Sequence, residues 1–239
     1  MPILKFVLLV TLAALLPGRA DAACRQALAL GLDVSGSVNA REYRLQLDGL
    51  ANALRHPEVR AALLAMPEAP VALSVFEWSG PNHQQVILPW TMIDSDSALA
   101  DAAARIEGKQ RRPAETSTAV GLAMLYGAEL LSSRSSCWKR TLDLSGDGKS
   151  NTGPRPRDVL SDRRFASLTV NALVVGADAS AGDDIRQAEI AELSSYFRAE
   201  VLVGPDAFIE TALGFDAFEA AMVRKLLREL EGVALSKAD

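Results

Sequence analysis

Apolar runs alternate with amphipathic segments along most of the chain. A continuous apolar run that ends in turn residues is typical of a buried strand, whereas apolar residues spaced three and four apart predict a helix that packs by one face. Strands are expected from residue 28 to the turn at 33–38, and at 71–78, 85–90, 138–144, 168–175 and 199–203. Helices are expected after the cap residue Asn39 and at 58–66, 93–106, 118–131, 183–194 and 215–230, with another passing through Val159 and Phe165.

This alternation of strands and helices predicts an α/β fold, with a doubly wound, mostly parallel sheet covered by helices on both faces. The turn residues 79–82 lie between the strands at 71–78 and 85–90, which only six residues separate. So short a turn excludes a parallel crossover, and one of these strands is therefore expected to be an antiparallel edge strand. No repeat, heptad run or low-complexity linker interrupts the pattern, so residues 23–239 are expected to form a single domain.

Residues 1–22 have the pattern of a secretory signal peptide. An apolar core follows Lys5 and ends at Pro17, and the small-x-small sequence at 20–22 is a cleavage signal. The apolar run is too short to span a bilayer, although a retained anchor and a lipoprotein attached at Cys24 remain alternatives. The mature protein is expected in the periplasm or outside the cell, with no integral membrane segment after cleavage.

The net charge and the cysteines indicate which partners and which covalent links to expect. The net charge of −5 argues against a nucleic-acid partner, which requires a basic surface. Cys24 and Cys137 are the only cysteines, and each stands directly before an expected strand. In an oxidising compartment this pair is expected to form a disulfide, the alternative being two independent thiols.

The first strand ends in a turn rich in oxygen donors. Asp33, Ser35 and Ser37 alternate around Gly36, so their side chains can converge beyond the strand end. Open α/β sheets place their ligand sites at this edge. Oxygen donors without thiol or imidazole suit Mg²⁺, Mn²⁺ or Ca²⁺.

Two later segments complete a known pattern. Thr116 stands just before the helix at 118–131, and Asp147 follows the strand at 138–144. The series Asp-x-Ser-x-Ser, then Thr, then Asp resembles the metal-ion-dependent adhesion site of von Willebrand factor A (VWA) domains. Within that superfamily, the segments at 77–80 and 204–208 look most like an uncharacterised group of bacterial exported proteins.

The resemblance implies a divalent cation, most readily Mg²⁺, that binds a carboxylate offered by a protein partner. Hydroxyl oxygens would come from Ser35, Ser37 and Thr116, while Asp33 and Asp147 would bind directly or through water. Thr118 competes with Thr116, but the first threonine matches the motif. The expected function is thus a metal-dependent binding module of the cell envelope, and the alternative is a structural protein whose metal stabilises its loops.

Enzymatic alternatives fit the sequence poorly. Haloacid-dehalogenase-like phosphatases also carry an Asp after the first strand, and their mechanism resembles attack by that Asp with a second Asp two residues later as acid and base. Ser35 stands at the second position, and a hydroxyl cannot shuttle the proton near neutral pH. A serine hydrolase fits less well still, because Gly-x-Ser-x-Gly is absent around Ser35 and because His56 and His83 are placed away from the strand ends. We therefore do not expect an enzyme.

Overall fold

A computed structural model describes residues 23–176, 183–204 and 206–234. The predicted signal peptide at 1–22 lies outside the described residues. Within them the strands are β1 (Gln26–Asp33), β2 (Val71–Trp78), β3 (Gln84–Ile93), β4 (Lys139–Gly146), β5 (Thr169–Val175) and β6 (Ile209–Ala212). The helices are α1 (Ala40–Arg55), α2 (Pro57–Leu64), α3 (Asp96–Glu107), α4 (Val120–Ser132), α5 (Pro156–Val159), α6 (Asp183–Glu200) and α7 (Phe218–Ala234), with 3-10 turns η1 (Arg163–Ser167) and η2 (Phe215–Ala217).

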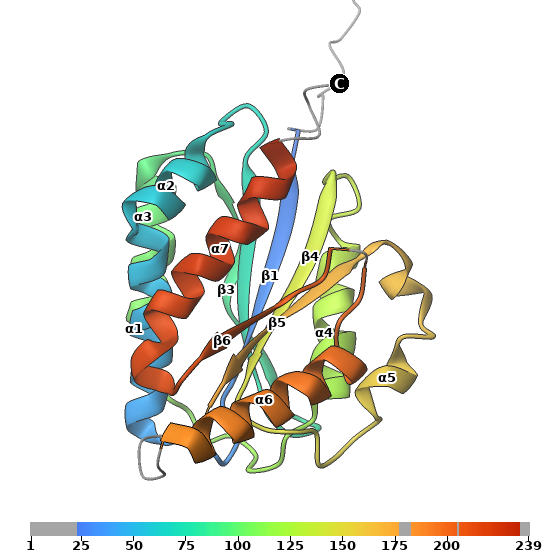
Figure 1. Cartoon of the computed structure of the whole chain (residues 1–239). Coiled ribbons are helices and arrows are strands. Elements are labelled where there is room, and N and C mark those ends of the chain that lie inside the picture. The colour runs from blue at the N-terminus through green and yellow to red at the C-terminus, as the bar shows by residue number, and fades with distance from the viewer. Residues whose placement is uncertain (1–22, 177–182, 205, 235–239) are drawn as a thin grey trace, which may run out of the picture.

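The strands form one sheet in the order β3-β2-β1-β4-β5-β6. All neighbours are parallel except β2 and β3, which pair antiparallel at one edge, as the short turn between them predicts. Helices α1, α2, α3 and α7 cover one face, and α4, α5 and α6 cover the other (Figure 1). This confirms the doubly wound α/β fold with helices on both faces.

The prediction of a strand at residues 199–203 is wrong. Residues 199–203 do not form a strand, because α6 continues to Glu200 and only Val203 bridges to Val170. Phe197 and Val201 are fully buried at a spacing of four, which is the helical period and prevails over the β-branched composition of the segment. The sixth strand is instead β6, a short segment that the hydrophobic pattern did not indicate.

The helix predicted through Val159 and Phe165 is divided into two pieces. Helix α5 ends at Val159, and η1 begins at Arg163. Asp162 lies between them and accepts a hydrogen bond from the backbone N–H of Arg164. Because an aspartate that caps a helix N-terminus in this way favours the start of a new helical turn, the chain breaks here instead of continuing one helix.

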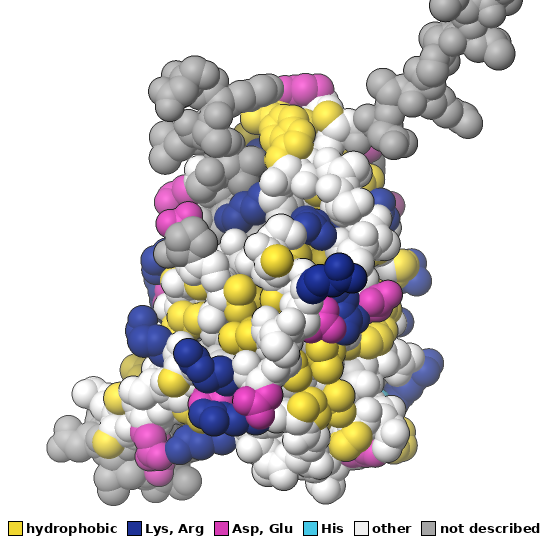
Figure 2. Space-filling model, turned by 90° about the vertical axis from the view of Figure 1, so that its right-hand side faces the viewer, with side chains coloured by type: hydrophobic (Ala, Val, Ile, Leu, Met, Phe, Trp, Pro, Cys, Tyr) yellow, Lys and Arg dark blue, Asp and Glu magenta, His cyan; other side chains and the backbone are white. Residues whose placement is uncertain are grey.

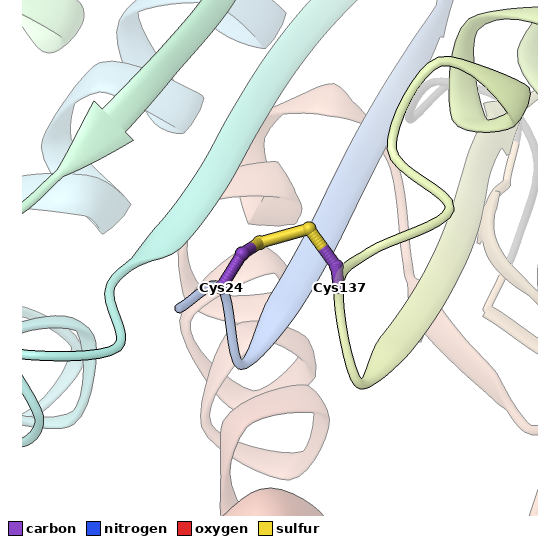
Figure 3. The surroundings of a disulfide bond; sticks show 2 residues. All are labelled: Cys24 and Cys137. Carbon is purple, nitrogen blue, oxygen red and sulfur yellow. A yellow bond between two sulfur atoms is a disulfide. The ribbon is translucent and has the colours of Figure 1, made fainter. Parts of the chain in front are cut away.

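The predicted disulfide is present between Cys24 and Cys137. Their Cα atoms lie 4.6 Å apart, at the starts of β1 and β4 (Figure 3). The strands are parallel neighbours, so their N-terminal ends meet at the same edge of the sheet. The bond closes a span of 113 residues, and its edge of the sheet is opposite to the strand ends where a ligand site is expected.

Helix α1 begins directly after the oxygen-rich turn. The Asn39 side chain accepts hydrogen bonds from the N–H groups of Arg41 and Glu42, and the Glu42 carboxylate accepts from the Asn39 N–H, which makes a capping box. Tyr43 and Leu47 are among the residues that bury the inner face of α1 against the sheet. The N-terminus of α1 is thereby fixed beside the end of β1.

The outer surface mixes charges of both signs. Figure 2 shows one face of the molecule, on which Lys and Arg side chains lie beside Asp and Glu side chains among hydrophobic ones. Ion pairs on the α4–α6 side include Arg155–Glu200 and Arg164–Glu129. Within the described residues, no helix combines the length and the apolar character needed to cross a membrane.

Candidate metal centre

Two aspartates meet at the carboxyl ends of the two central strands. Gly31 of β1 pairs with Leu144 of β4 in parallel register, which brings Asp33 to the level of Gly146. Asp147 follows β4 directly. The ends of β1 and β4 lie together at the lower end of the sheet in Figure 1. The fold therefore brings together two carboxylates that are separated by more than a hundred residues of sequence.

A chain of hydrogen bonds joins four of the five predicted ligands. The Asp33 Oδ1 accepts from the Ser35 N–H at 2.8 Å, and the Ser35 and Ser37 hydroxyls lie 3.3 Å apart. The Ser37 Oγ donates to the Asp147 Oδ1 at 2.7 Å. Asp33 and Ser35 are buried while Ser37 is exposed, so the chain runs from the interior to the surface.

The fifth predicted residue, Thr116, lies on a loop that touches this turn. The Gly36 N–H donates to the Thr116 carbonyl at 3.0 Å. A Cβ at position 36 would lie 2.9 Å from that carbonyl oxygen, so only glycine permits the approach. Glu115 fixes the loop from its other side, because its carboxylate accepts hydrogen bonds from the backbone and side chain of Asn82.

The two threonines of this loop differ in their surroundings. Thr116 is exposed at the site, whereas Thr118 is only 6% exposed. The Thr118 N–H donates to the Asn151 side chain, and its carbonyl accepts from the Asn151 N–H. Thr118 thus holds the loops of α4 and β4 together, while Thr116 stays exposed.

Burial acts on both carboxylates, and the like charge of Asp147 also acts on Asp33. Burial, followed by the negative charge of Asp147, raises the pKa of Asp33 to about 7, although the Ser35 hydrogen bond acts in the opposite direction. Burial also raises the pKa of Asp147. Asp33 Oδ2 is buried and has no hydrogen-bond partner in the part of the chain that the structure describes. A buried carboxylate oxygen without a partner is costly, and a cation would satisfy it.

The donor set fits a hard divalent cation. Its five side chains offer only oxygen, from three hydroxyls and two carboxylates. Within the described residues, no group of three or more His, Cys, Asp or Glu side chains is arranged to hold a metal. A shallow cavity lined by Asp147, Gly148 and Ile190 borders the site.

Two residues that hold Asp33 in place, Gln46 and Ser145, were not predicted from the sequence. The Gln46 Nε2 donates to the Asp33 carbonyl at 3.0 Å, and the Gln46 Oε1 accepts from the Ser145 Oγ at 2.9 Å. Both side chains are buried. A detectable signal existed, because Gln46 is a polar residue on the apolar face of α1, one helical turn after Tyr43.

Comparison with known families identifies the chain. The family model described as a protein of unknown function (DUF1194) matches residues 23–234. The chain belongs to this family. The DUF1194 match spans all the described residues, including the five of the candidate site. A comparison with curated proteins finds no match.

Solved structures place this DUF1194 chain among VWA-like folds. One is proximal thread matrix protein 1 from the mussel byssus, whose metal-ion-dependent adhesion site (MIDAS) motif is occupied by zinc. It is 16% identical with a TM-score of 0.57, and the match covers 87% of this chain and 46% of that one. The pilus adhesin SpaC from Lactobacillus rhamnosus GG is 14% identical with a TM-score of 0.62, over 89% and 31%. A von Willebrand factor type A structure from Catenulispora acidiphila is 14% identical with a TM-score of 0.55, over 88% and 43%. The chain thus spans less than half the length of each of these structures, and the likeness establishes the fold.

Proposed function

We propose that this DUF1194 chain is an exported binding module that holds a divalent cation at the ends of β1 and β4 and uses it to recognise a carboxylate on a protein partner. The observation that carries the proposal is the buried Oδ2 of Asp33, which has no hydrogen-bond partner among the described residues and lies near Asp147 and the hydroxyls of Ser35 and Ser37. Asp33, Ser35, Ser37, Thr116 and Asp147 would hold the cation, with Mg²⁺ favoured and Mn²⁺ or Ca²⁺ as alternatives.

Each residue has a separate task in this proposal. The two carboxylates supply the negative charge, and the hydroxyls supply neutral oxygens that leave the cation strongly attractive to an incoming anion. A bound cation of this kind supplies a Lewis-acidic position for an external carboxylate. Ser37 and Thr116 are exposed, so a partner can reach the site from solvent.

The relatives in fold agree with a binding role. One is a pilus adhesin, and another is a matrix protein whose MIDAS motif holds zinc. We propose recognition rather than catalysis because position 35 bears a hydroxyl, which cannot serve as the proton shuttle of a phosphatase.

The experiment measures metal binding and partner binding in the same proteins. Wild type, Asp33→Ala and Thr116→Ala are titrated with Mg²⁺ and Mn²⁺ by calorimetry. The same proteins, immobilised, then capture envelope proteins with Mg²⁺ or with EDTA. We expect Asp33→Ala to lose both activities and Thr116→Ala to weaken both, with circular dichroism confirming that each variant is folded.

Asp96→Ala is the matched control, because Asp96 is an exposed carboxylate that is paired with Arg60 away from the site. It should bind metal and partner as wild type does. Metal binding without any EDTA-sensitive partner would favour the alternative, a structural protein with a stabilising cation. Metal affinity that is equal in wild type and Asp33→Ala would refute the site itself.

A further inference from the structure

A second group of charged residues is buried beneath α7, away from the candidate metal centre. It consists of four residues, here called the α7 cluster: Asp143 of β4, Asn171 of β5, and Lys225 and Glu229 of α7. None of the four is more than 2% exposed. Asp143 and Asn171 are paired neighbours in the sheet, and Lys225 and Glu229 are one helical turn apart. Helix α7 lies across this face of the sheet (Figure 1).

The contacts place an amine against a carboxyl group, with a second carboxyl group beside them. The Lys225 Nζ is 3.0 Å from the Asp143 Oδ2 and 3.6 Å from the Glu229 Oε1. The Asn171 side-chain N–H donates to the Glu229 Oε1. The Phe208 ring covers the Lys225 Nζ at 4.4 Å from the ring centroid. Solvent is thereby excluded from the amine and from both carboxyl groups.

Burying an ordinary ion pair at this position costs free energy. Removing an ammonium and a carboxylate from water costs several kcal/mol per ion, and the attraction between them often fails to repay it. The α7 cluster also contains a second carboxylate, Glu229, whose other cationic neighbour is the partly exposed Lys139 at 4.0 Å. Burial, together with the nearby Glu229, raises the pKa of Asp143 to about 6, although Lys225 opposes this shift. Burial therefore favours the neutral acid form of Asp143 in the cluster.

We propose that Lys225 and Asp143 condense to form an isopeptide bond that joins α7 covalently to β4. A proton first passes from the Lys225 ammonium to the Asp143 carboxylate, which leaves an amine and a carboxylic acid. The amine nitrogen attacks the carboxyl carbon and forms the C–N bond. Glu229 accepts the proton released by the nitrogen and gives it to the departing hydroxyl, so that the C–O bond breaks and one water molecule leaves.

The folded structure provides conditions for the condensation of Lys225 with Asp143 that are absent in water. Groups held in contact in a reactive orientation have effective concentrations on the order of 10⁵ M or more. Burial favours the neutral reactants, and the reaction replaces two buried charges with a neutral amide. Glu229 keeps its hydrogen bond to Asn171 and its contact with Lys139 after the reaction.

The first test uses the wild-type full chain and requires no variant. After reduction and alkylation of the cysteines, the protein is denatured, weighed by intact mass spectrometry and mapped by proteolysis. We expect a mass lower than that of the unlinked chain by one water molecule, and a branched peptide that contains both Asp143 and Lys225. An unmodified mass with two separate peptides would overturn the proposal. Water loss confined to a Lys225–Glu229 link within α7 would overturn it as well.

Variants then identify the reacting atoms. Lys225→Arg and Asp143→Ala should retain the full unlinked mass, and Glu229→Gln should accumulate unlinked chain. Asp143→Asn should lose ammonia in place of water, because an amide then provides the leaving group. Lys109→Arg is the matched control and should show the same loss of water as wild type. A loss of ammonia from the wild-type chain would assign the bond to Asn171 and refute Asp143 as the partner.

Discussion

Replacing Asp33 by asparagine is expected to stabilise the metal-free protein. Asparagine has nearly the same shape, and its carbonyl can still accept the Ser35 N–H that bonds to Asp33 Oδ1. What disappears is a buried negative charge with one unpartnered oxygen next to Asp147. Asp33 therefore lowers the stability of the metal-free protein, and a bound cation would remove this cost. A residue selected only for stability would not carry such a cost.

The pKa of Asp33 determines the magnitude and the sign of the pH dependence of the free energy of unfolding. Burial and Asp147 raise it from 3.8 to about 7 in the folded state. Between these values the folded state binds more protons than the unfolded state, so the free energy of unfolding falls as pH rises. The whole shift corresponds to at most on the order of 4 kcal/mol, of which about 3 kcal/mol lies between pH 5 and pH 8. Asparagine lacks this dependence.

Urea unfolding in EDTA at pH 5 and pH 8 measures the effect. The stability of Asp33→Asn relative to wild type should be greater at pH 8 than at pH 5. Added Mg²⁺ at pH 8 should stabilise wild type, by about 2.7 kcal/mol at a hundredfold excess over its dissociation constant, and leave the variant unchanged. Asp96→Asn, an exposed control, should follow wild type. A variant that is less stable than wild type at both pH values, and equally responsive to Mg²⁺, would refute the reasoning.

Three further outcomes are expected. Replacing Cys24 and Cys137 by serine should lower the free energy of unfolding by up to about 4–5 kcal/mol in urea, because the bond closes 113 residues, and an unchanged midpoint would contradict this. Gly36→Ala should weaken Mn²⁺ binding in calorimetry, because its Cβ would push the Thr116 carbonyl away, whereas wild-type affinity would show that the loop contact is unimportant. Gln46→Leu should cost about 1–3 kcal/mol in thermal unfolding, because the carbonyl at the end of β1 loses its buried donor, and a neutral effect would argue against that support.

The sequence predicts most of the fold because the buried parallel strands are continuous apolar runs with sharp ends. Those ends also predict the site, since parallel neighbours such as β1 and β4 must present their carboxyl ends at one edge. The sequence does not predict strand β6, because only Ala212 of its four residues is buried and the segment carries little apolar pattern. The segment at 199–203 was misassigned because short apolar runs with β-branched residues suit either structure, and only packing decides between them.

Buried polar contacts could not be predicted from the sequence. Asp143 alternates with leucines in β4, which suggests a polar face, yet it lies under α7 beside Lys225. Likewise, Gln46 is a single polar residue on an apolar helix face, and the pattern does not reveal that it reaches the Asp33 carbonyl. Such pairings depend on side chains that are distant in sequence and are positioned only by the assembled sheet.

Paramagnetic broadening by Mn²⁺ tests the central claim most directly. In an NMR spectrum of the ¹⁵N-labelled protein, substoichiometric Mn²⁺ should selectively broaden the backbone amides around Ser35, Ser37, Thr116 and Gly148. The amide of Cys137, at the opposite edge of the sheet, should stay sharp, and excess Mg²⁺ should restore the lost signals. Broadening centred elsewhere, or the same pattern in Asp33→Asn, would contradict a cation site at the ends of β1 and β4.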